Sequence, residues 1–469
     1  MHIRPLAFLF FSIVLVLAGF CGDVAGAVPV ENLEAFRSFV RTESWSENWR
    51  EADGKVQVRE VRGELWNDAI QAALLKDGTV HIPARAEPYC LDAPIILKSG
   101  QSLLADATAE LRLKPGTNTC LVRNEHVVGF NDRPVPAGVE PDTDIRIEGG
   151  IWTTLANGVP GANGNLRGAS AKQNPVAGTH GVILLHNVRK VTVQNVTVRQ
   201  SKPFGVHLGN AQDFVVDGVR LDRHERDGVH VDGPSGNGVI RNVSGDSHDD
   251  PVALTAWDWV NYIVTYGPIH HITIEHITGV PVSQHGTDAI RLLPGVKRFA
   301  DGSTLDCDIH DIVLRDITDI REFKFYDQPN LEKGRDQDAS AGLGKLRNIL
   351  LQRLHFTRPG VIQIAAEVDG LRVEEVNLNF TLPPTFKLVE IGPMSATYRL
   401  GKDPAHWVEL FSPDLDVTVR NFHLVKVSID GQPVADAEAR FVAVKDQQLN
   451  LDYPHTSPRG GTGKAKVLP

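Results

Sequence analysis

The chain has 469 residues, of which 42% are hydrophobic and 7% aromatic, and its formal net charge is -10 at pH 7. This surplus of acidic residues argues against a nucleic-acid partner, because a phosphate backbone is bound by a basic surface. The length would allow two or three ordinary domains, but a repeated pattern from residue 188 onward predicts one long domain, which we place at 61–454 including its end cap.

The first 27 residues are typical of a secretory signal peptide. Arg4 precedes an apolar run at 6–20, and Ala-Gly-Ala at 25–27 places small residues before a cleavage site. The run is too short to span a bilayer comfortably, and no other stretch has the pattern of a membrane span. We therefore predict a secreted or periplasmic protein. Lipoprotein processing at Cys21 is the weaker alternative, because the bulky Phe20 precedes it.

Three cysteines remain after removal of the signal peptide, so at least one of Cys90, Cys120 and Cys307 is unpaired. Cys90 and Cys120 lie beside apolar strand residues in neighbouring early turns. A disulfide between them suits an exported protein, and buried free thiols are equally common. The sequence leaves both alternatives open.

A short helix is expected after an N-terminal extension at 28–60. The segment 66–75 (WNDAIQAALL) has apolar residues at helical spacing, and Asn67 or Asp68 can cap its start. A single helix ahead of a stack of strands can cover the open end of the core. Residues 78–113 then indicate the first short strands and turns.

The body of the chain repeats a phrase of two alternating apolar strands separated by a polar residue. The repeats are VRKVTVQNVTV (188–198), AQDFVVDGVRL (211–221), SGNGVIRNVSG (235–245), IHHITIEHITG (269–279), IHDIVLRDITD (309–319), LRNILLQRLHF (346–356) and VDGLRVEEVNL (368–378). Their first apolar anchors are 23, 24, 34, 40, 37 and 22 residues apart. A base coil of this length with three insertions predicts a solenoid of parallel strands.

A second set of strands follows the repeated phrase and also aligns between coils. One parity of these strands is apolar and faces the core. The opposite parity places four residues in one outward column, which we expect to be exposed as a substrate face: His207, His230, Ala253 and Arg291. The insertions at 257–268, 295–307 and 328–344 all enter beside this strand, so they are expected to form the wall of a groove. The polar, glycine-rich segment 455–469 is expected to be a flexible tail.

The opening NDAIQAALLKDGTVHIPA, followed by stacked coils, resembles the pectin-lyase-like superfamily over residues 60–380. This resemblance implies an all-β, right-handed parallel β-helix with an N-terminal capping helix. Within the superfamily, the closest likeness is to the polygalacturonase family of inverting glycoside hydrolases. That family carries an Asn-Thr-Asp-Gly turn and, one coil later, Gly-Asp-Asp before an apolar strand.

The resemblance implies that three aspartates are catalytic. ERDGVHVDG (225–233) supplies Asp227, and SHDDPVAL (247–254) supplies Asp249 and Asp250, one coil of 22 residues later. Asp249 would be the general acid, while Asp227 and Asp250 would position the attacking water. Inversion ordinarily separates the acid and base carboxyl groups by ~6.5–9.5 Å, which neighbouring coils can supply. Crowded carboxylates also favour one protonated member near neutral pH.

The family motifs are incomplete elsewhere. Glu-Arg replaces Asn-Thr before Asp227, and His248 replaces the glycine before Asp249. His285 lies one residue from the place of the family histidine, and Lys324 has no arginine partner on its own coil because Arg291 comes one coil early. The aspartates are therefore carried over, but the pectic substrate is not.

Eight residues are candidates for substrate binding, either from the outward column, from the family motifs or from aromatic rings that can stack on sugars. They are His207, His230, His248, Trp257, Trp259, His285, Arg291 and Lys324. At least one of the two tryptophans is expected to anchor its loop instead. His270, His271 and His276 alternate with core residues and lack a convergent ligand set, so we expect no metal there.

Three functions remain open. The first is an exported glycoside hydrolase without a cofactor, which acts on a poly- or oligosaccharide that can include uronic acids. The second is a calcium-dependent polysaccharide lyase or epimerase, in which Asp227, Asp249 and Asp250 hold Ca²⁺ and Arg291 or a lysine removes a proton. The third is a non-catalytic sugar-binding solenoid. The sequence selects neither a particular polysaccharide nor an oligomeric state.

Overall fold

The computed structural model describes most of the chain after residue 32. The described residues are 33–50, 54–127, 138–156, 159, 162–163, 181–257, 265–280, 289–299, 301–326, 342–393, 416–445 and 465–468, with backbone alone at 396–399, 407–409 and 457–458. The predicted signal peptide (1–27) and two predicted site residues, Trp259 and His285, lie outside this part of the chain. No helix among the described residues is long and apolar enough to cross a membrane.

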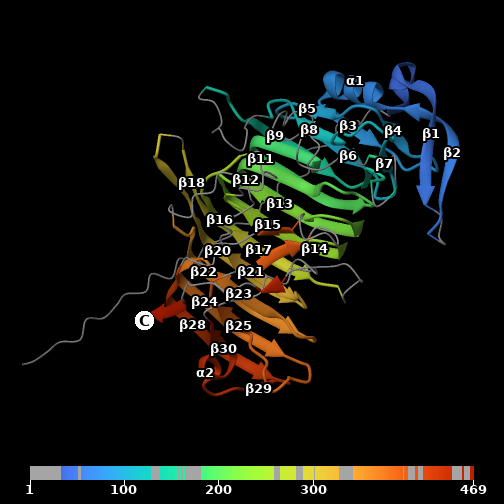
Figure 1. The fold of residues 1–469 in the computed structure, drawn as a ribbon. Coiled ribbons are helices and arrows are strands. Elements are labelled where there is room, and N and C mark those ends of the chain that lie inside the picture. Colours follow the sequence, from blue (N-terminus) through green and yellow to red (C-terminus); the bar gives the residue numbers. More distant parts are fainter. Residues whose placement is uncertain are drawn as a thin grey trace, which may run out of the picture.

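A helical cap closes the N-terminal end of the stack (Figure 1). The 3₁₀-helix η1 (Leu33–Phe39) and helix α1 (Asn67–Asp77) lie together there. Ile70 and Leu74 of α1 are fully buried in the main core cluster, which confirms the capping helix. Its N-cap residue is Trp66 and no side chain caps the start, so the expected capping by Asn67 or Asp68 is wrong. Instead, the Asn67 amide donates to the Asp68 carboxylate.

An antiparallel hairpin of β1 (Arg41–Arg50) and β2 (Val56–Leu65) flanks this cap. The first coils are built from short parallel strands: β3 (Thr79–Ile82), β4 (Tyr89–Leu91), β5 (Ile95–Leu97), β6 (Ser102–Ala105), β7 (Glu110–Leu113), β8 (Val122–Asn124), β9 (Asp142–Glu148) and β10 (Ile151–Thr153). They pair in three columns, β3 with β6 and β9, β4 with β7 and β10, and β5 with β8. Three strand columns therefore surround the core.

All three columns continue into the long strands of the central coils. These are β11 (Gly181–Arg199), β12 (Phe204–His224), β14 (Ser235–Ser247), β16 (Ile269–Thr278), β20 (Ile309–Thr318), β22 (Lys345–Phe356), β24 (Glu367–Leu378) and β28 (Val417–Ile429). The anchors of the repeated phrase pair as predicted, with Phe214 opposite Gly238, Ile272 opposite Ile312 and Ile349 opposite Leu371. The stack is a parallel β-helix (Figure 1), as the sequence predicted.

The column that begins with β5 and β8 runs through the first residues of β11 and β12, continues in shorter strands and carries the predicted site. These shorter strands are β13 (Val229–Asp232), β15 (Val252–Thr255), β17 (Ala289–Leu293), β21 (Glu322–Tyr326), β23 (Val361–Ala365), β25 (Val389–Ile391) and β30 (Val442–Val444). Each strand pairs in parallel with the next. The rungs of this column therefore hold side chains from successive coils about 4.8 Å apart.

The polar residues that interrupt each repeated phrase make its bends. One such position in each coil has a positive φ, as in Asn195 (56°), Gly218 (74°), Asn242 (57°) and Asp316 (57°). Asn and Asp adopt this left-handed conformation more readily than other side chains, and Gly does so without strain. The bends turn the chain from one face of the coil to the next.

The segment 295–307 forms an antiparallel hairpin of β18 (Gly295–Arg298) and β19 (Thr304–Cys307), which projects from the stack (Figure 1). The far end contains β26 (Ala396–Arg399), β27 (Trp407–Glu409), β29 (Gln432–Pro433), helix α2 (Ala437–Phe441), β31 (Ser457–Pro458) and β32 (Ala465–Leu468). Strand β32 pairs with β28, so this part of the expected flexible tail is a strand of the stack.

The three described cysteines are all thiols. Cys90, Cys120 and Cys307 are all buried and none forms a disulfide, so the Cys90–Cys120 alternative is wrong. Cys90 packs in a small cluster with Trp45 and Leu65, whereas Cys120 packs against Val127 and Leu184. The two thiols therefore belong to different clusters.

Candidate active site

Three aspartates converge where two neighbouring coils enter the short strands. Asp227 precedes β13 and Asp250 precedes β15. The backbone pairs them, because the amide of Gly228 donates to the carbonyl of Asp250 over 2.9 Å. One carboxylate oxygen from each of Asp227, Asp249 and Asp250 lies within 4.8 Å of the others. The structure thus brings together the three aspartates that the sequence singled out.

This spacing differs from our expectation. We expected ~6.5–9.5 Å between the acid and base carboxyl groups, as in ordinary inverting sites, but the nearest oxygens lie within 4.8 Å. The carboxylates approach because adjacent rungs, about 4.8 Å apart, hold them side by side. This spacing does not by itself select inversion.

Two cations from later coils hold the pair of buried aspartates. Arg291 of β17 lies 2.9 Å from Asp227 Oδ2 through its NH2 group and 3.2 Å from Asp250 Oδ2 through Nε. Lys324 Nζ of β21 lies 2.6 Å from Asp250 Oδ1. Arg291 and Lys324 are opposite each other in the register of adjacent strands. In the sequence, the basic pair of the family looked incomplete. In the structure, Arg291 and Lys324 lie side by side and form this pair, but both bind aspartates of the site.

Asp249 and Asp227 differ in protonation. Burial raises the pKa of Asp249 to about 7, and the negative charges of Asp227 and Asp250 add to this rise. Asp227 is desolvated too, but Arg291 and His230 outweigh this effect and hold its pKa well below the usual range. The pKa of Arg291 is raised well above its usual value by Asp227 and Asp250, despite burial.

Two buried histidines support Asp227. His230 Nδ1 lies 2.6 Å from Asp227 Oδ2, and its Nε2 lies 3.0 Å from Asp232 Oδ1. Burial alone would lower the pKa of His230, but the two carboxylates raise it to about 9. His224 Nε2 lies 2.9 Å from the carbonyl oxygen of Asp227, and burial lowers the pKa of His224 to about 4. Asp227 is thereby fixed through both its backbone and its side chain.

The outward column is buried, which corrects the expectation of an exposed face. His207, His230, Ala253 and Lys324 have no exposed surface, and only 14% of the Arg291 side chain is accessible. Paired charges and hydrogen bonds make this burial tolerable. The column therefore forms the floor of the site instead of its open wall.

Two side chains near the aspartates do reach the surface. Asp249 is 26% exposed and Arg226 is 21% exposed, and Arg226 Nε lies 3.6 Å from Asp249 Oδ2. The Arg226 guanidinium also lies over the ring of Phe204, 5.1 Å from its centre. A molecule at this surface can therefore reach Asp249 and one cation together.

The remaining predicted residues lie in different places. His248 is half-buried, and its backbone amide donates to the carbonyl of His224 over 2.8 Å. Trp257 follows β15, whereas Asp250 precedes that strand, so the two lie at opposite ends of it. The centre of the Trp257 ring lies 5.4 Å from that of the Tyr266 ring and 4.5 Å from Lys297 Nζ. Trp257 thus packs against Tyr266 of its own insertion, as we expected of one tryptophan, and it also contacts Lys297 of the β18–β19 hairpin.

The sequence reasoning missed Arg226, His186 and Asp232. Arg226 was noted only as a departure from a family motif. Along their strands, His186 and Asp232 each lie two residues after the position that belongs to the outward column. Side chains two residues apart in a strand share a face, and this alternation could have identified both. Asp232 accepts from His207 and His230 together. The polar floor is therefore wider than the single column that we predicted.

No family model matches this sequence, and no curated protein does either. Among solved structures, endo-xylogalacturonan hydrolase from Aspergillus tubingensis is 12% identical over 86% of this chain and 96% of its own, with a TM-score of 0.43. An exopolygalacturonase from Thermotoga maritima is 11% identical over 79% and 88%, with a TM-score of 0.42. PfbA, a surface adhesin of Streptococcus pneumoniae, is 16% identical over 84% and 90%, with a TM-score of 0.37. These proteins include both hydrolases and an adhesin, so the function has to be argued from the site.

Proposed function

We propose that this protein is an exported glycoside hydrolase in which Asp249 is the general acid and Asp227 and Asp250 activate water. One observation carries the proposal: of three adjacent carboxyl groups, the partly exposed Asp249 has a pKa raised to about 7, while that of Asp227 is strongly lowered. Divergent protonation in one cluster is what acid–base hydrolysis requires. Export rests on the predicted signal peptide at 1–27.

The reaction follows from these protonation states. Asp249 donates its proton to the glycosidic oxygen as the bond from that oxygen to the anomeric carbon breaks. Water attacks the anomeric carbon and loses a proton to the carboxylate pair. Asp227 Oδ1 is buried and accepts no hydrogen bond from a described residue, so it can take this proton. Arg291 holds both carboxylates in place.

The resemblance to polygalacturonases implies inversion of the anomeric carbon. Because the carboxylates lie closer together than in ordinary inverting sites, inversion needs its own test. Proton NMR of the first product formed would show the opposite anomer to the substrate if water attacks directly. Accumulation of the same anomer, or a glycosyl adduct on Asp227 or Asp250, would indicate retention instead.

The cations of the site argue against a calcium-dependent lyase. Ca²⁺ takes six to eight oxygen ligands, yet Arg291 and Lys324 already bind the oxygens of Asp227 and Asp250. A lyase or epimerase also needs a base to remove a proton. The raised pKa of Arg291 keeps it charged, so it cannot serve as that base. The donor set therefore fits hydrolysis better.

A purely sugar-binding role does not account for the raised pKa of Asp249. Burying an acid beside two carboxylates costs stability, and such arrangements occur mainly where the proton is used. Arg226 is the accessible cation beside Asp249, and it could contact the carboxylate of a uronic acid. We therefore include acidic polysaccharides within the proposed substrate class.

The test is a panel of neutral and uronic-acid polysaccharides incubated with the purified protein, with and without a chelator. We expect at least one to yield saturated oligosaccharides, each heavier by one water per bond cleaved, at a rate that the chelator does not change. Ultraviolet-absorbing unsaturated products would establish a lyase. Saturable binding of a polysaccharide without any product would establish a binding protein.

A further inference from the structure

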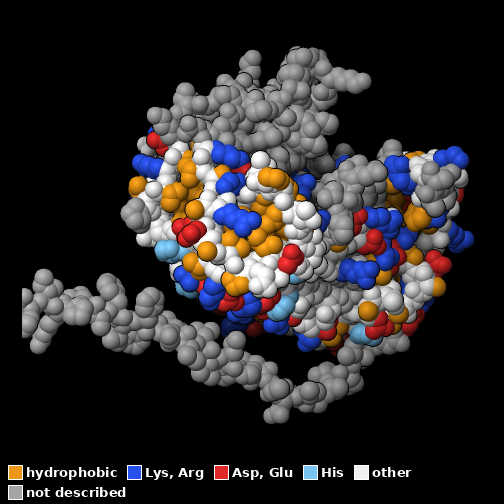
Figure 2. Space-filling view, turned by 90° about the horizontal axis from the view of Figure 1, so that it is seen from below, with side chains coloured by type: hydrophobic (Ala, Val, Ile, Leu, Met, Phe, Trp, Pro, Cys, Tyr) orange, Lys and Arg blue, Asp and Glu red, His pale blue; other side chains and the backbone are white. Residues whose placement is uncertain are grey.

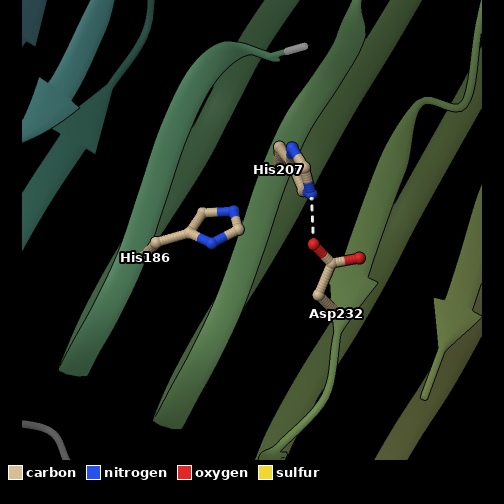
Figure 3. Close-up of side chains that lie close together, drawn as sticks. All are labelled: His186, His207 and Asp232. Atoms are coloured by element: carbon tan, nitrogen blue, oxygen red, sulfur yellow. Dashed lines mark hydrogen bonds and ion pairs between the residues drawn. The ribbon is translucent and has the colours of Figure 1, made fainter. Parts of the chain in front are cut away.

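A second cluster of ligating side chains lies on the buried floor, apart from the three aspartates. His186 of β11, His207 of β12 and Asp232 of β13 come from three successive coils (Figure 3). One ligating atom from each lies within 4.8 Å of the others. His207 Nε2 is 2.9 Å from Asp232 Oδ2, and the rings of His186 and His207 are 4.6 Å apart. All three side chains are fully buried.

We propose that His186, His207 and Asp232 bind a divalent transition-metal ion of the zinc type. Two imidazole nitrogens and one carboxylate oxygen are the donors that such ions prefer, and a three-residue set leaves room for a further ligand. Ligands about 2.1 Å from a metal lie roughly 3.0–3.4 Å from one another. His207 Nε2 and Asp232 Oδ2, 2.9 Å apart, already have this spacing, and the ligating atom of His186 lies within 4.8 Å of both.

The backbone beside the cluster is shaped to admit the His186 ring. In the strand register, Gly209 lies opposite His186 on one side and Asp232 on the other. A Cβ at Gly209 would stand 2.4 Å from the His186 ring and 2.9 Å from Thr265 Oγ1. Any side chain at this position would push His186 out of the cluster. Glycine is therefore required for the three ligands to meet.

Two buried hydroxyl groups add an independent indication of a ligand. Thr265 lies next to the His186 ring across Gly209, and Thr255 is opposite Asp232 in the strand register. Both side chains have no exposed surface. Neither Oγ1 has a hydrogen-bond partner among the described residues. A buried hydroxyl without a partner is destabilising, and a metal-bound water would satisfy it.

The surroundings of Asp232 also suit a ligand. Metal-binding carboxylates and imidazoles are usually held by a second layer of hydrogen bonds. Asp232 Oδ1 is bound by His230 Nε2 over 3.0 Å, and its carbonyl accepts from Ser235 Oγ over 2.6 Å. Oδ2 is the oxygen that faces His207 (Figure 3). The cluster shares no residue with Asp227, Asp249 and Asp250, so this inference stands independently of the proposed hydrolysis.

The test uses the full chain, purified without a polyhistidine tag, loaded with Zn²⁺ and dialysed before metal analysis. We expect about one Zn²⁺ per chain in the wild type and in H276Q, which removes an exposed histidine, and a loss of at least tenfold in H186Q. Substituted Co²⁺ should show the intense visible bands of a four- or five-coordinate ion. A chelator should lower the melting temperature of the wild type and H276Q but not that of H186Q.

Gly209→Ala provides a variant that keeps every ligand. Its Cβ should displace the His186 ring and weaken Zn²⁺ retention as H186Q does. The proposal is overturned if the dialysed wild type holds no Zn²⁺ and its Co²⁺ spectrum is that of the hydrated ion. Equal retention by soluble H186Q and the wild type would also overturn it. The wild-type measurements remain decisive if either variant fails to fold.

Discussion

At the scale of single residues, Asp249 differs from its two neighbours in what surrounds it. Arg291 bridges Asp227 and Asp250, and Lys324 adds a second cation to Asp250. Among the described residues, Asp249 pairs with Arg226 at the longer distance of 3.6 Å, and Lys324 lowers its pKa less than Arg226 does. Asp227 and Asp250 are thus stabilised as anions, and their charges favour the proton on Asp249. In the proposed mechanism, the ion pairs that fix Asp227 and Asp250 also make Asp249 the acid.

The raised pKa of Asp249 predicts a stability effect that depends on pH. Asp249 keeps its proton in the folded state up to about pH 7, whereas the unfolded chain loses it near pH 3.9. Folded protein therefore binds more protons between these values, and its stability falls as pH rises through them. D249N stays neutral, so we expect it to be more stable than the wild type at pH 8 by about 1–3 kcal/mol, with no difference near pH 3.5.

Thermal unfolding of the wild type, D249N and D213N at these two pH values measures this effect. Asp213 is an exposed bend residue with a positive φ of 57°, which asparagine also adopts readily. D213N should therefore follow the wild type. A D249N gain that is the same at both pH values would show that Asp249 is not protonated in the folded protein at neutral pH.

Arg226 is expected to affect both the pKa of Asp249 and the binding of an acidic substrate. It lowers the pKa of Asp249, so R226Q should raise that pKa and move the basic limb of the pH–rate profile upward. Loss of a charge-assisted contact of about 1.5 kcal/mol should also raise KM for a uronic-acid substrate roughly tenfold. R223Q, which alters an exposed arginine of the same turn, should change neither quantity. An unmoved profile in R226Q would separate Arg226 from the acid.

At the scale of elements, the repeat was predictable because both core packing and bends require particular residue types at regular positions in the sequence. Period-two apolar residues face the core, and the polar interruptions mark the positive-φ bends. The 22-residue step from Asp227 to Asp249 predicted neighbouring coils, although the strand register is 23 residues and places Asp227 beside Asp250. Burial of the outward column was not predictable in this way, because it depends on segments that are distant in sequence. The convergence of Arg291 and Lys324 needed the exact strand register as well.

The one glycine among the core anchors has a packing explanation. Phe214 and Gly238 are opposite each other in adjacent coils, and a Cβ at Gly238 would lie 2.2 Å from the tip of the Phe214 ring. The ring fills the space of two side chains. G238A should therefore cost about 1–3 kcal/mol through overpacking.

Urea unfolding of G238A, F214V and the double variant tests this pairing. The smaller valine frees the space beside position 238, so G238A should cost less in the F214V background than alone. Strictly additive costs would show that the glycine is needed for some other reason.

At the scale of the whole molecule, the stack needs a cover at its end. Its coils share one continuous apolar core, and α1 covers the N-terminal end (Figure 1). The end of the stack seen from below carries intermixed acidic and basic side chains (Figure 2), without a broad patch of one sign among its described residues. We expect selection of an acidic substrate to depend on Arg226 beside Asp249. The long strands hold that site rigidly over several coils.

Opening the cap should expose both apolar core and strand edges. Ile70 of α1 is fully buried, and I70D places a charge there at a cost of about 3–5 kcal/mol. We expect a lower melting temperature together with self-association, visible by light scattering, because exposed edges pair with other chains. L75D changes a residue of the same helix that is 62% exposed and should leave both properties unchanged. A monomeric I70D with normal melting would contradict the capping role.

The central claim is that Asp249 supplies the proton for hydrolysis. The most direct measurement is the rate of reducing-end release from a polysaccharide that the wild type cleaves, compared between wild type, D249N and the control D213N at equal folded concentration. We predict that D213N matches the wild type and that D249N is slower by roughly 10²–10⁴-fold, the usual worth of a general acid. A folded D249N that releases reducing ends at the wild-type rate would contradict the account.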